Sequence, residues 1–523
     1  MRVGAFLALA ALAAVIGLAF QGTRGLYESS ETRYAECARE MMVGGDWLQP
    51  TLRGEPHWTK PPLTYWAIAG GMRLLGRNEW GARLYGAAAF VLATVGVALL
   101  GRALWDDRAG LTAGLIYATS PFVLGAANVV TTDMLLTLWE VLAVLAYWRA
   151  RRAATPRGAG AWMVAMWVAF GLGFFTKGPP ALLPLVAIIP FHVWMRRRGQ
   201  PGPRLVSLAG LALFAALGFW WYAVVALGHP RLMDYFLEDE VLDRLTTNRF
   251  GRNPEWYKPF MLYLPPLAFG IGLWVAFWPG LVRRWVADVR HAALRAWLSG
   301  HPEALFLMLW LAGPLLVLSV VPSRLPLYVL SLMAVPALAT ARGLACRSGG
   351  PGLGRAVWAI ALASAVLGIV GKGVLARLPS AHDSRPLAVA MLAQAVPGAR
   401  FAVVDRPEKY GPDFYLDGRV TRLASRQPRG DVFDDDVAGL VRTLGGPDRS
   451  AWVIAFEADA AAAVTDALDR AGIPYSRAPA WRKYGLVVIP RGDHVLRGPP
   501  WAGRDRGPTA GRRSGYPPEA GRL

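Results

Sequence analysis

Residues 28–66, ESSETRYAECAREMMVGGDWLQPTLRGEPHWTKPPLTYW, form a long polar segment in a very apolar chain of 523 residues. The segment follows a first apolar run, residues 2–20, and gathers acidic, basic and aromatic side chains beside the end of that run. Ionisable side chains at a membrane are usually paired or functional, because leaving them unpaired there is unfavourable. We therefore predict an active-site loop at a membrane surface. An ordinary solvated loop is the alternative, since loops generally lie on the surface.

The composition of the whole chain indicates a membrane protein. Hydrophobic residues make up 54% of the sequence and charged residues 18%, whereas soluble domains carry about 25% charged residues. The apolar residues form runs that approach the length of about 20 residues needed to cross a bilayer as a helix. Many of the 22 tryptophans lie at the ends of these runs, as in the aromatic belts of membrane proteins. The sequence thus predicts a polytopic α-helical membrane protein.

Counting the apolar runs gives about 11 spans. They are residues 2–20, 80–100, 111–126, 134–148, 162–175, 180–194, 205–227, 261–282, 304–321, 325–341 and 357–370. The first run also fits a cleaved signal peptide, but no clear cleavage site follows it, and we interpret it as a span. With the N-terminus inside, every arginine-rich connection falls on the inner side, as the positive-inside rule requires. The net charge of +20 therefore reflects membrane topology and predicts no nucleic-acid partner.

Two short elements are expected in the polar segment. Residues 32–43 show helical spacing, with Tyr34 and Cys37 on an apolar face and Glu36 and Arg39 elsewhere. This pattern predicts an amphipathic helix in the plane of the membrane interface. Residues 63–75 form a second apolar element that is too short to be assigned as a span.

The chain changes character after residue 370. Short apolar stretches at 400–405, 451–456 and 484–489 predict strands, and 434–444 and 459–471 predict helices. We expect a transmembrane domain at 1–372 with an outer-face loop at 21–79, a small α/β domain at 380–490 outside the membrane, and a disordered tail at 491–523.

Familiar soluble catalytic motifs are missing. The sequence contains no phosphate-binding Gly-Lys-Ser/Thr loop and no His-Glu-x-x-His, which disfavours an ATP-driven pump. Gly171 and Gly173 lie inside an apolar run and predict close helix packing. Cys37 and Cys346 are expected on opposite sides of the membrane, so we predict no disulfide. His57 and His229 have no partners at a metal-ligand spacing.

Acids and bases at the outer ends of the apolar runs remain as candidates. Asp133 is a lone carboxylate at the mouth of a run; a helix N-cap is the alternative. Lys60 and Arg244 are candidates for binding a lipid phosphate, with snorkelling to headgroups as the alternative. Tyr328 begins a run, where an aromatic-belt role is the alternative. Lys177 also lies at a run end, with a headgroup contact as the alternative.

Together these segments resemble the aminoarabinose transferase and protein O-mannosyltransferase group of GT-C fold membrane glycosyltransferases. The resemblance rests on Glu31-Thr-Arg-Tyr-Ala-Glu-Cys-Ala-Arg-Glu-Met41, Gly45-Asp-Trp, Lys60-Pro-Pro-Leu-Thr-Tyr-Trp, Thr131-Thr-Asp-Met, Gly173-Phe-Phe-Thr-Lys-Gly-Pro and Ser323-Arg-Leu-Pro-Leu-Tyr328. It covers roughly the first 350 residues. It implies a GT-C-like fold with about 11–13 transmembrane helices and an external C-terminal domain.

The resemblance also implies an activity. A polyprenyl-phosphate-linked sugar would be the donor, and a lipid such as lipid A, a glycan or a protein the acceptor. Transfer would occur on the outer face of a bacterial inner membrane, among membrane lipids and without a nucleotide. We expect no cofactor, because the lipid-linked sugar is a substrate. A divalent cation is left open but is not predicted.

The resemblance assigns roles to residues of this chain. Glu31 and Asp133 match catalytic acids, and Arg33 and Tyr34 belong to the acceptor loop. The donor phosphate would be held by Lys60, Arg244, Arg324 and Tyr328. An acid that precedes Glu31 in the family is replaced here by Ser30, so Glu31 or Glu28 would have to substitute for it. Family positions implied in metal binding are occupied by Thr59 and Val241, so no metal site is predicted.

Two other classes of function stay open. A transporter or flippase of lipid-linked glycans would place charged residues deep in several spans and show repeat symmetry. The sequence pattern indicates charges at span ends and no repeat. A non-catalytic relative, whose external domain binds a glycan or a partner, is the third interpretation, and Ser30 in place of the family acid keeps it open.

Overall fold

The computed structural model describes residues 3–490 apart from 201, 230, 237, 239–251, 293, 347–353, 407, 426–432, 445–449 and 482. The chain forms two compact units. Unit 1 consists of Met1–Val389 and Glu408–Gly418, and unit 2 of Ala390–Pro407 and Arg419–Leu523. Unit 1 thus extends past residue 372, the predicted end of the transmembrane domain. It also includes residues 408–418, which lie within the range 380–490 predicted for the external domain. The predicted tail at 491–523 lies outside the described residues.

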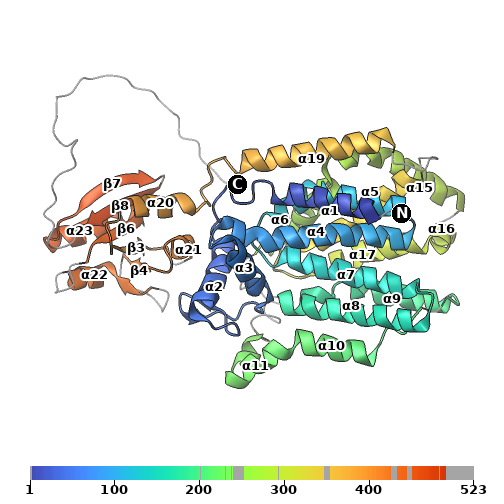
Figure 1. Cartoon of the computed structure of the whole chain (residues 1–523), viewed down its shortest axis with the longest axis horizontal. Helices are drawn as coiled ribbons and strands as arrows, with labels where there is room; N and C mark the ends of the chain where they lie inside the picture. The colour runs from blue at the N-terminus through green and yellow to red at the C-terminus, as the bar shows by residue number, and fades with distance from the viewer. Residues whose placement is uncertain are drawn as a thin grey trace. The chain divides into compact units, whose positions relative to one another are not determined.

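Unit 1 is a bundle of apolar helices (Figure 1). In the described part of the chain, six helices are long and apolar enough to cross a membrane, or up to nine if each bent pair is one span. The six are α4 (Glu79–Leu104), α8 (Pro156–Lys177), η1 with α9 (Pro179–Arg197), α17 (Pro302–Val320), η4 and η5 with α18 (Pro326–Ala345) and α19 (Arg355–Leu375). The prediction of a polytopic helical membrane protein is confirmed.

Three further predicted runs are broken helices. They are α5 (Asp107–Ala118) with α6 (Pro121–Ala127), bent by 62°; α10 (Leu208–Gly218) with α11 (Trp220–Gly228), bent by 43°; and α14 (Lys258–Phe269) with Gly272–His291, which contains η3 (Gly272–Phe277) and most of α15 (Trp278–Ala292), bent by 81°. Pro121 at the start of α6 has no N–H to continue the α5 ladder. Gly272, with φ of +64°, adopts at the third break a conformation that favours glycine. The last two predicted runs correspond to α1 (Val3–Leu18) and α7 (Asp133–Arg151).

Close approach between the helices depends on small residues, as in other membrane bundles. A Cβ atom on Gly171 of α8 would lie 3.0 Å from the Cβ of Leu217 at the end of α10. On Gly173 it would lie 2.9 Å from the Cβ of Ala181. The predicted packing role of this pair is confirmed. In Figure 1, α1, α4, α7 and α8 run side by side at the centre of the bundle.

Helix α1 packs within this bundle. Its Leu9, Ala13 and Ile16 are buried, and Lys372 of α19 donates hydrogen bonds from Nζ to the backbone oxygens of Ile16 (3.1 Å) and Gly17 (2.7 Å). This packing supports the interpretation of α1 as a span.

The polar segment contains α2 (Ser30–Gly44), a short hairpin of β1 (Thr51–Leu52) and β2 (Glu55–Pro56), and α3 (Leu63–Leu75). Helix α2 ends at Gly44, one residue beyond the predicted end, because Gly45 adopts a φ of +76° and donates its N–H to the Met41 oxygen. Its surroundings differ from the prediction. Helix α21 (Gly411–Tyr415) and α3 both pack against α2, so that even Glu36 and Arg39 are buried. Protein therefore encloses both faces of α2, whereas an amphipathic helix lying on the membrane interface would leave its polar face exposed. The position of α2 relative to the membrane stays a prediction.

Unit 2 contains a six-stranded sheet in the order β5-β4-β3-β6-β8-β7. The strands are β3 (Arg400–Val404), β4 (Val420–Ala424), β5 (Asp435–Asp436), β6 (Trp452–Glu457), β7 (Ser476–Trp481) and β8 (Tyr484–Ile489). Strands β5, β4, β3 and β6 are parallel, and β8 and β7 are added antiparallel. Helices α22 (Val437–Leu444) and α23 (Ala461–Arg470) pack on the same apolar core, and α20 (Arg385–Ala393) leads from unit 1 into unit 2. The predicted α/β class is confirmed.

Candidate functional site

Asp133 and Lys177 meet where two neighbouring helices of unit 1 end. Asp133 is the first residue of α7, and Lys177 is the last of α8. Lys177 Nζ lies 2.5 Å from Asp133 Oδ1, and both side chains are about nine-tenths buried, with 11% exposure each. Thr132, rather than Asp133, occupies the N-cap position. The carboxylate is therefore held in an ion pair, which the N-cap alternative did not foresee.

This pair opens into an apolar cavity of about 500 Å³. Polar side chains at its wall include Lys60, Asp133, Lys177, Tyr328 and Glu140. Most of the remaining wall is aromatic or aliphatic: Trp58, Leu136, Phe174, Leu183, Phe219, Tyr222, Met233, Phe236, Val317, Leu318, Val321 and Leu327. Binding sites of this kind fit a ligand with a long apolar part and a charged end. Three residues that the sequence analysis singled out, Lys60, Asp133 and Tyr328, are far apart in the chain. The structure brings them together in the wall of one cavity.

Lys177 lies beside Asp133, and Lys60 and the Tyr328 ring line the same cavity. Lys177 Nζ lies 4.7 Å from the centre of the Tyr328 ring, a distance typical of a cation–π contact. Lys60 precedes α3 and donates from Nζ to the Thr59 oxygen at 2.6 Å, so its charged end is held near the cavity wall. For Lys177, a contact with lipid headgroups was the alternative. Its ion pair with Asp133 makes it part of the site.

Glu140 is a site residue that the sequence analysis missed. It lies seven residues after Asp133 on α7, which places it on the same side of the helix and about 10 Å deeper. Its side chain is buried and bonds to Ser331 on the far wall of the cavity. The spacing of two acids on one helical face was the available signal. The expectation that charges lie only at the ends of spans is therefore wrong.

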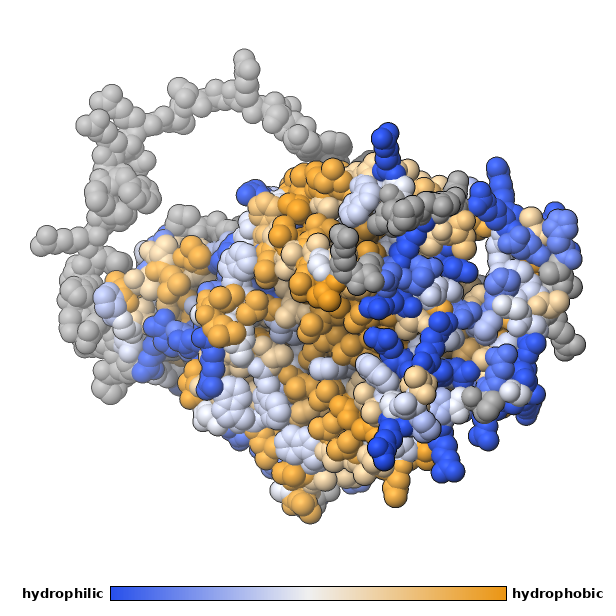
Figure 2. Space-filling view, turned by 45° about the vertical axis from the view of Figure 1, so that its right-hand side comes forward, coloured by the Kyte–Doolittle hydropathy of each residue, from blue (hydrophilic) through white to orange (hydrophobic). Residues whose placement is uncertain are grey.

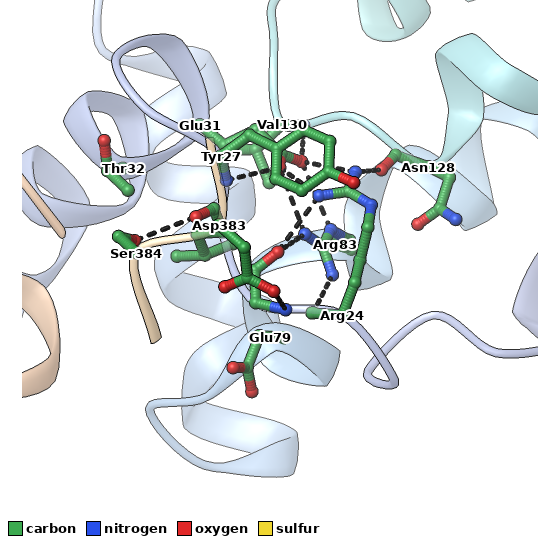
Figure 3. A network of polar contacts seen from close by, with 12 residues as sticks. Arg24, Tyr27, Glu31, Thr32, Glu79, Arg83, Asn128, Val130, Asp383 and Ser384 are labelled. Atoms are coloured by element: carbon green, nitrogen blue, oxygen red, sulfur yellow. Dashed lines mark hydrogen bonds and ion pairs between the residues drawn. The ribbon is translucent and has the colours of Figure 1, made fainter. Parts of the chain in front are cut away.

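Glu31 lies away from the cavity wall, in a buried network of charges shown in Figure 3. Its carboxylate lies 2.5 Å from Arg24 Nη1 and 3.1 Å from Arg83 Nη2. It also accepts hydrogen bonds from the backbone N–H groups of Tyr27 and Val130, both at 2.9 Å. Burial alone would raise the pKa of Glu31, but the guanidinium groups of Arg83 and Arg24 outweigh burial and lower it to about 2.

The network holds the loop that leads into Asp133. Arg24 Nη2 donates to the Asn128 oxygen (2.5 Å), Glu31 accepts from the Val130 N–H, and the Tyr85 hydroxyl donates to the Thr131 oxygen (2.7 Å). Gln21 Nε2 adds a hydrogen bond to the Ala127 oxygen at 3.3 Å. Side chains from three different segments thus fix four backbone groups between residues 127 and 131, just ahead of the acid at the cavity.

Glu28 is also committed elsewhere. Its carboxyl oxygens accept hydrogen bonds from Thr32 Oγ1 (2.6 Å) and from the backbone N–H groups of Gly411 (2.7 Å) and Tyr410 (3.1 Å). Burial raises the pKa of this carboxyl above its usual range. Ser30, at the position of the missing acid, is exposed. Neither Glu28 nor Glu31 therefore reaches the cavity as a substitute.

Three of the other predicted residues, Arg324, Tyr34 and Arg33, are described by the structure and lie outside the lining of the cavity. Arg324 does not line the cavity, because its guanidinium donates to the backbone oxygens of Asn253 (3.1 Å), Glu255 (3.0 Å) and Ser319 (2.9 Å). Tyr34 is buried, its ring centre lies 5.6 Å from that of Tyr65, and its hydroxyl interacts with Thr132 beside Asp133.

Arg33 covers the Tyr34 ring, with its Cζ 5.6 Å from the ring centre. Arg244 and Val241 lie outside the described residues. Among the residues that the structure describes, no group of three or more His, Cys, Asp or Glu side chains lies close enough to hold a metal ion. His57 instead pairs its Nε2 with the Thr59 hydroxyl at 2.8 Å.

Comparison with known families and proteins relates the chain to membrane transferases. Residues 59–220 match the family of dolichyl-phosphate-mannose-protein mannosyltransferases. The chain is 32% identical over 332 residues to an undecaprenyl phosphate-alpha-4-amino-4-deoxy-L-arabinose arabinosyl transferase of Pseudomonas paraeruginosa, covering 62% of this chain and 56% of that protein. The corresponding protein of Pseudomonas savastanoi pv. phaseolicola is 32% identical over 355 residues, covering 67% of this chain and 63% of its own length. The matched region thus spans little more than half of these relatives.

Solved structures extend the likeness to the fold. ArnT from Cupriavidus metallidurans bound to undecaprenyl phosphate superposes with a TM-score of 0.70 at 20% identity, covering 93% of this chain and 98% of that chain. An oligosaccharyltransferase of Archaeoglobus fulgidus reaches a TM-score of 0.50 at 13% identity, covering 95% and 75%. The expected resemblance to GT-C fold membrane transferases is confirmed.

Proposed function

We propose that this chain, a GT-C fold relative of the aminoarabinose transferases and the dolichyl-phosphate-mannose-protein mannosyltransferases, is a membrane glycosyltransferase. It would take a sugar from a polyprenyl-phosphate donor and pass it to a lipid acceptor of the lipid A type, or to a glycan or protein. Its place would be the inner membrane of a bacterium, with the cavity open to the outer face. The observation that carries the proposal is one apolar cavity lined by Asp133, Lys177, Lys60 and Tyr328.

The donor would enter with its polyprenyl chain against the apolar wall of the cavity. Lys60 and Lys177 both line this cavity and would form charge-assisted hydrogen bonds to the phosphate oxygens, which are among the stronger hydrogen bonds in proteins. The same two ammonium groups would stabilise the negative charge that grows on the phosphate as it leaves. In support of this arrangement, ArnT of Cupriavidus metallidurans, which shares the fold, is bound to undecaprenyl phosphate.

In the transfer step an acceptor oxygen attacks the anomeric carbon of the sugar, the bond from that carbon to the phosphate oxygen breaks, and polyprenyl phosphate leaves with the bonding electrons. Where the acceptor is a hydroxyl, Asp133 would accept its proton. Where the acceptor is a phosphate, no strong base is required, and Asp133 would act by orienting Lys177. Glu31 is assigned a positioning role, because its four hydrogen-bonding partners occupy its carboxylate.

One observation favours transport instead. Glu140 lies inside α7 in an apolar wall, as expected for a transporter of lipid-linked glycans. The relatives with matching sequences are transferases, and Glu140 faces the same cavity as Asp133, so we rank transport second. A non-catalytic relative ranks third.

The test is sugar transfer by the purified chain in lipid, with a polyprenyl-phosphate sugar and an envelope extract as acceptor. Wild type should transfer the sugar, and Asp133→Asn should lose transfer by roughly 100-fold or more. Asp107→Asn is the matched control, because Asp107 pairs with Arg102 at the other end of the bundle. Asp133→Asn with wild-type transfer would remove the assigned site, and folded wild type without transfer from any lipid donor would remove the proposed function.

A further inference from the structure

Unit 1 contains a second cavity, of about 870 Å³, that no part of the proposed reaction uses. We propose that it binds an anionic phospholipid of the inner leaflet. Its wall is formed by α15, α16, the first half of α17 and α18, with Leu267 of α14 and Trp105, which directly follows α4. The volume lies within the range of pockets that enclose small amphiphilic ligands.

The second cavity lies away from the first. Both cavities contact α17, the second through residues 303–311 and the first through residues 317–321. A helix rises 1.5 Å per residue, so Leu307 and Val317 are separated by roughly 15 Å along the axis. The second cavity belongs to the end of the bundle where the arginines of the inner loops gather. Figure 2 shows hydrophilic side chains crowded at this end, beside an apolar band of the same unit.

The cavity is open to the surroundings of unit 1 through apolar side chains. Val282, Trp285 and Met308 line it and are still 52%, 40% and 43% exposed. Helix α15 alternates tryptophan and aliphatic residues with arginines, as is typical of helices at a membrane interface. Trp278 of this helix donates from Nε1 to Thr340 Oγ1 of α18 at 2.9 Å, which fixes one wall. Acyl chains would therefore find an ordered apolar surface.

The polar edge of the cavity is suited to a phosphate. Arg284 and Arg342 both line it, and in the described part of the chain neither forms an ion pair with a carboxylate. Arg342 is instead placed over the Trp105 ring, with its Cζ 5.6 Å from the ring centre. A guanidinium offers paired donors that match phosphate oxygens.

The other titratable groups of the cavity leave this edge positive. Glu303 is bound to Arg152, 3.1 Å from its Nη2. His301 has its Nδ1 2.9 Å from the Trp297 oxygen, and its ring stacks on Trp297 with centres 4.6 Å apart. Asp288 lies on α15 four residues after Arg284 and is the one acid in the wall that neither pairs nor bonds among the described residues. Two guanidinium groups against one carboxylate favour a headgroup with one net negative charge, such as phosphatidylglycerol.

The experiment measures lipid binding by the purified full chain with native mass spectrometry. The probes are phosphatidylglycerol and phosphatidylethanolamine with identical acyl chains. Wild type should retain phosphatidylglycerol preferentially. Arg284→Gln and Arg342→Gln should each weaken its binding about five-fold, since an arginine near an anionic headgroup contributes on the order of 1 kcal/mol. Arg283→Gln, on the same helix but outside the cavity wall, is the matched control and should bind as wild type.

A further variant tests the cavity without removing an arginine, in case the arginine variants fail to fold. Ala304→Trp fills the cavity without changing charge and should also reduce phosphatidylglycerol binding, at an unchanged melting temperature in lipid-free detergent. Equal binding of the two lipids, wild-type binding by the double arginine variant, or displacement of phosphatidylglycerol by undecaprenyl phosphate would each overturn the proposal. None of these measurements uses donor or acceptor, so they stand apart from the test of transfer.

Discussion

Glu31 accepts a hydrogen bond from the backbone N–H of Val130, 99 residues later in the chain, at 2.9 Å. This contact ties the start of α2 to the loop that ends at Asp133. The carboxylate that holds the loop is itself held by Arg24 and Arg83. The acid at the cavity is thus positioned by an acid that does not reach the cavity.

Glu31→Gln should destabilise the protein by about 3–5 kcal/mol, because it leaves two buried guanidinium groups without their counter-charge. Thermal unfolding in detergent measures this effect. Glu55→Gln, in the exposed hairpin of the same polar segment, is the control and should unfold as wild type. A Glu31→Gln protein that unfolds as wild type yet transfers no sugar would instead identify Glu31 as the catalytic base.

Acid should weaken the same network. The pKa of Glu31 is about 2 in the folded chain and 4.5 without its partners, so the stabilisation is complete above pH 4.5 and is lost as the pH falls toward 2. Between about pH 6 and about pH 3 the loss should be about 2 kcal/mol. Chemical unfolding at a series of pH values gives the slope. In Glu31→Gln this contribution to the slope should disappear, and a slope identical to wild type would contradict the assignment.

The Asp133–Lys177 ion pair should show coupling in a double-mutant cycle. Asp133→Asn and Lys177→Met each strand one buried charge and should each cost about 3 kcal/mol of stability. The double variant removes both charges, so its loss should be smaller than the sum of the two. Additive losses in unfolding measurements would mean that the 2.5 Å contact contributes nothing. Lys177→Arg, which keeps the charge, should retain more transfer than Lys177→Met.

Glu140→Gln separates transfer from transport. If the cavity holds the donor lipid of a transferase, the change should raise the apparent KM for the donor and leave kcat within about ten-fold, because Glu140 lies about 10 Å from Asp133 along α7. Loss of lipid translocation in vesicles, with transfer absent in wild type as well, would favour the transporter. Thr137→Ser, between these acids in the same wall, controls for disturbance of the cavity.

The contact between α8 and α10 predicts opposite results for two glycines of α8. Gly171→Ala should destabilise the protein by about 1–3 kcal/mol, because the new methyl group would meet Leu217 and Phe214 at 3.0–3.3 Å. Gly160→Ala, with nothing within 4 Å, should be neutral or stabilise by about 0.5–1 kcal/mol through helix propensity. Melting temperatures of the two variants test the packing directly.

Periodicity and hydropathy predicted the helices of unit 1 well, since membrane helices of about 20 apolar residues leave a strong signal. The bounds of α3, residues 63–75, were predicted to the residue. Strand β4 was missed because its five residues, VTRLA, include an arginine that turns out to be buried. Local pattern reports only average exposure, and it failed where a charged side chain is buried.

The sequence predicted only some of the residues of the site. Residues at the ends of apolar runs converge on one side of the bundle, which is why Lys60, Asp133 and Tyr328 share a cavity. Sequence carries no information on where a long side chain points. Arg324 was expected to bind the donor phosphate, but its guanidinium donates to backbone oxygens instead. Glu140 was missed because it lies within an apolar run.

Segment 408–418 returns from the middle of unit 2 to unit 1, where Gly411 donates to Glu28 and Phe414 enters the apolar core. The two units are therefore interleaved in sequence rather than joined end to end. A deletion after residue 389 would strip unit 1 of a piece of its own core. For the same reason, exchange of the C-terminal part between relatives by a single crossover would bring a foreign segment against α2. We expect functional chimeras to need one junction on each side of this segment, in addition to the one near residue 389, so that unit 1 keeps its own core.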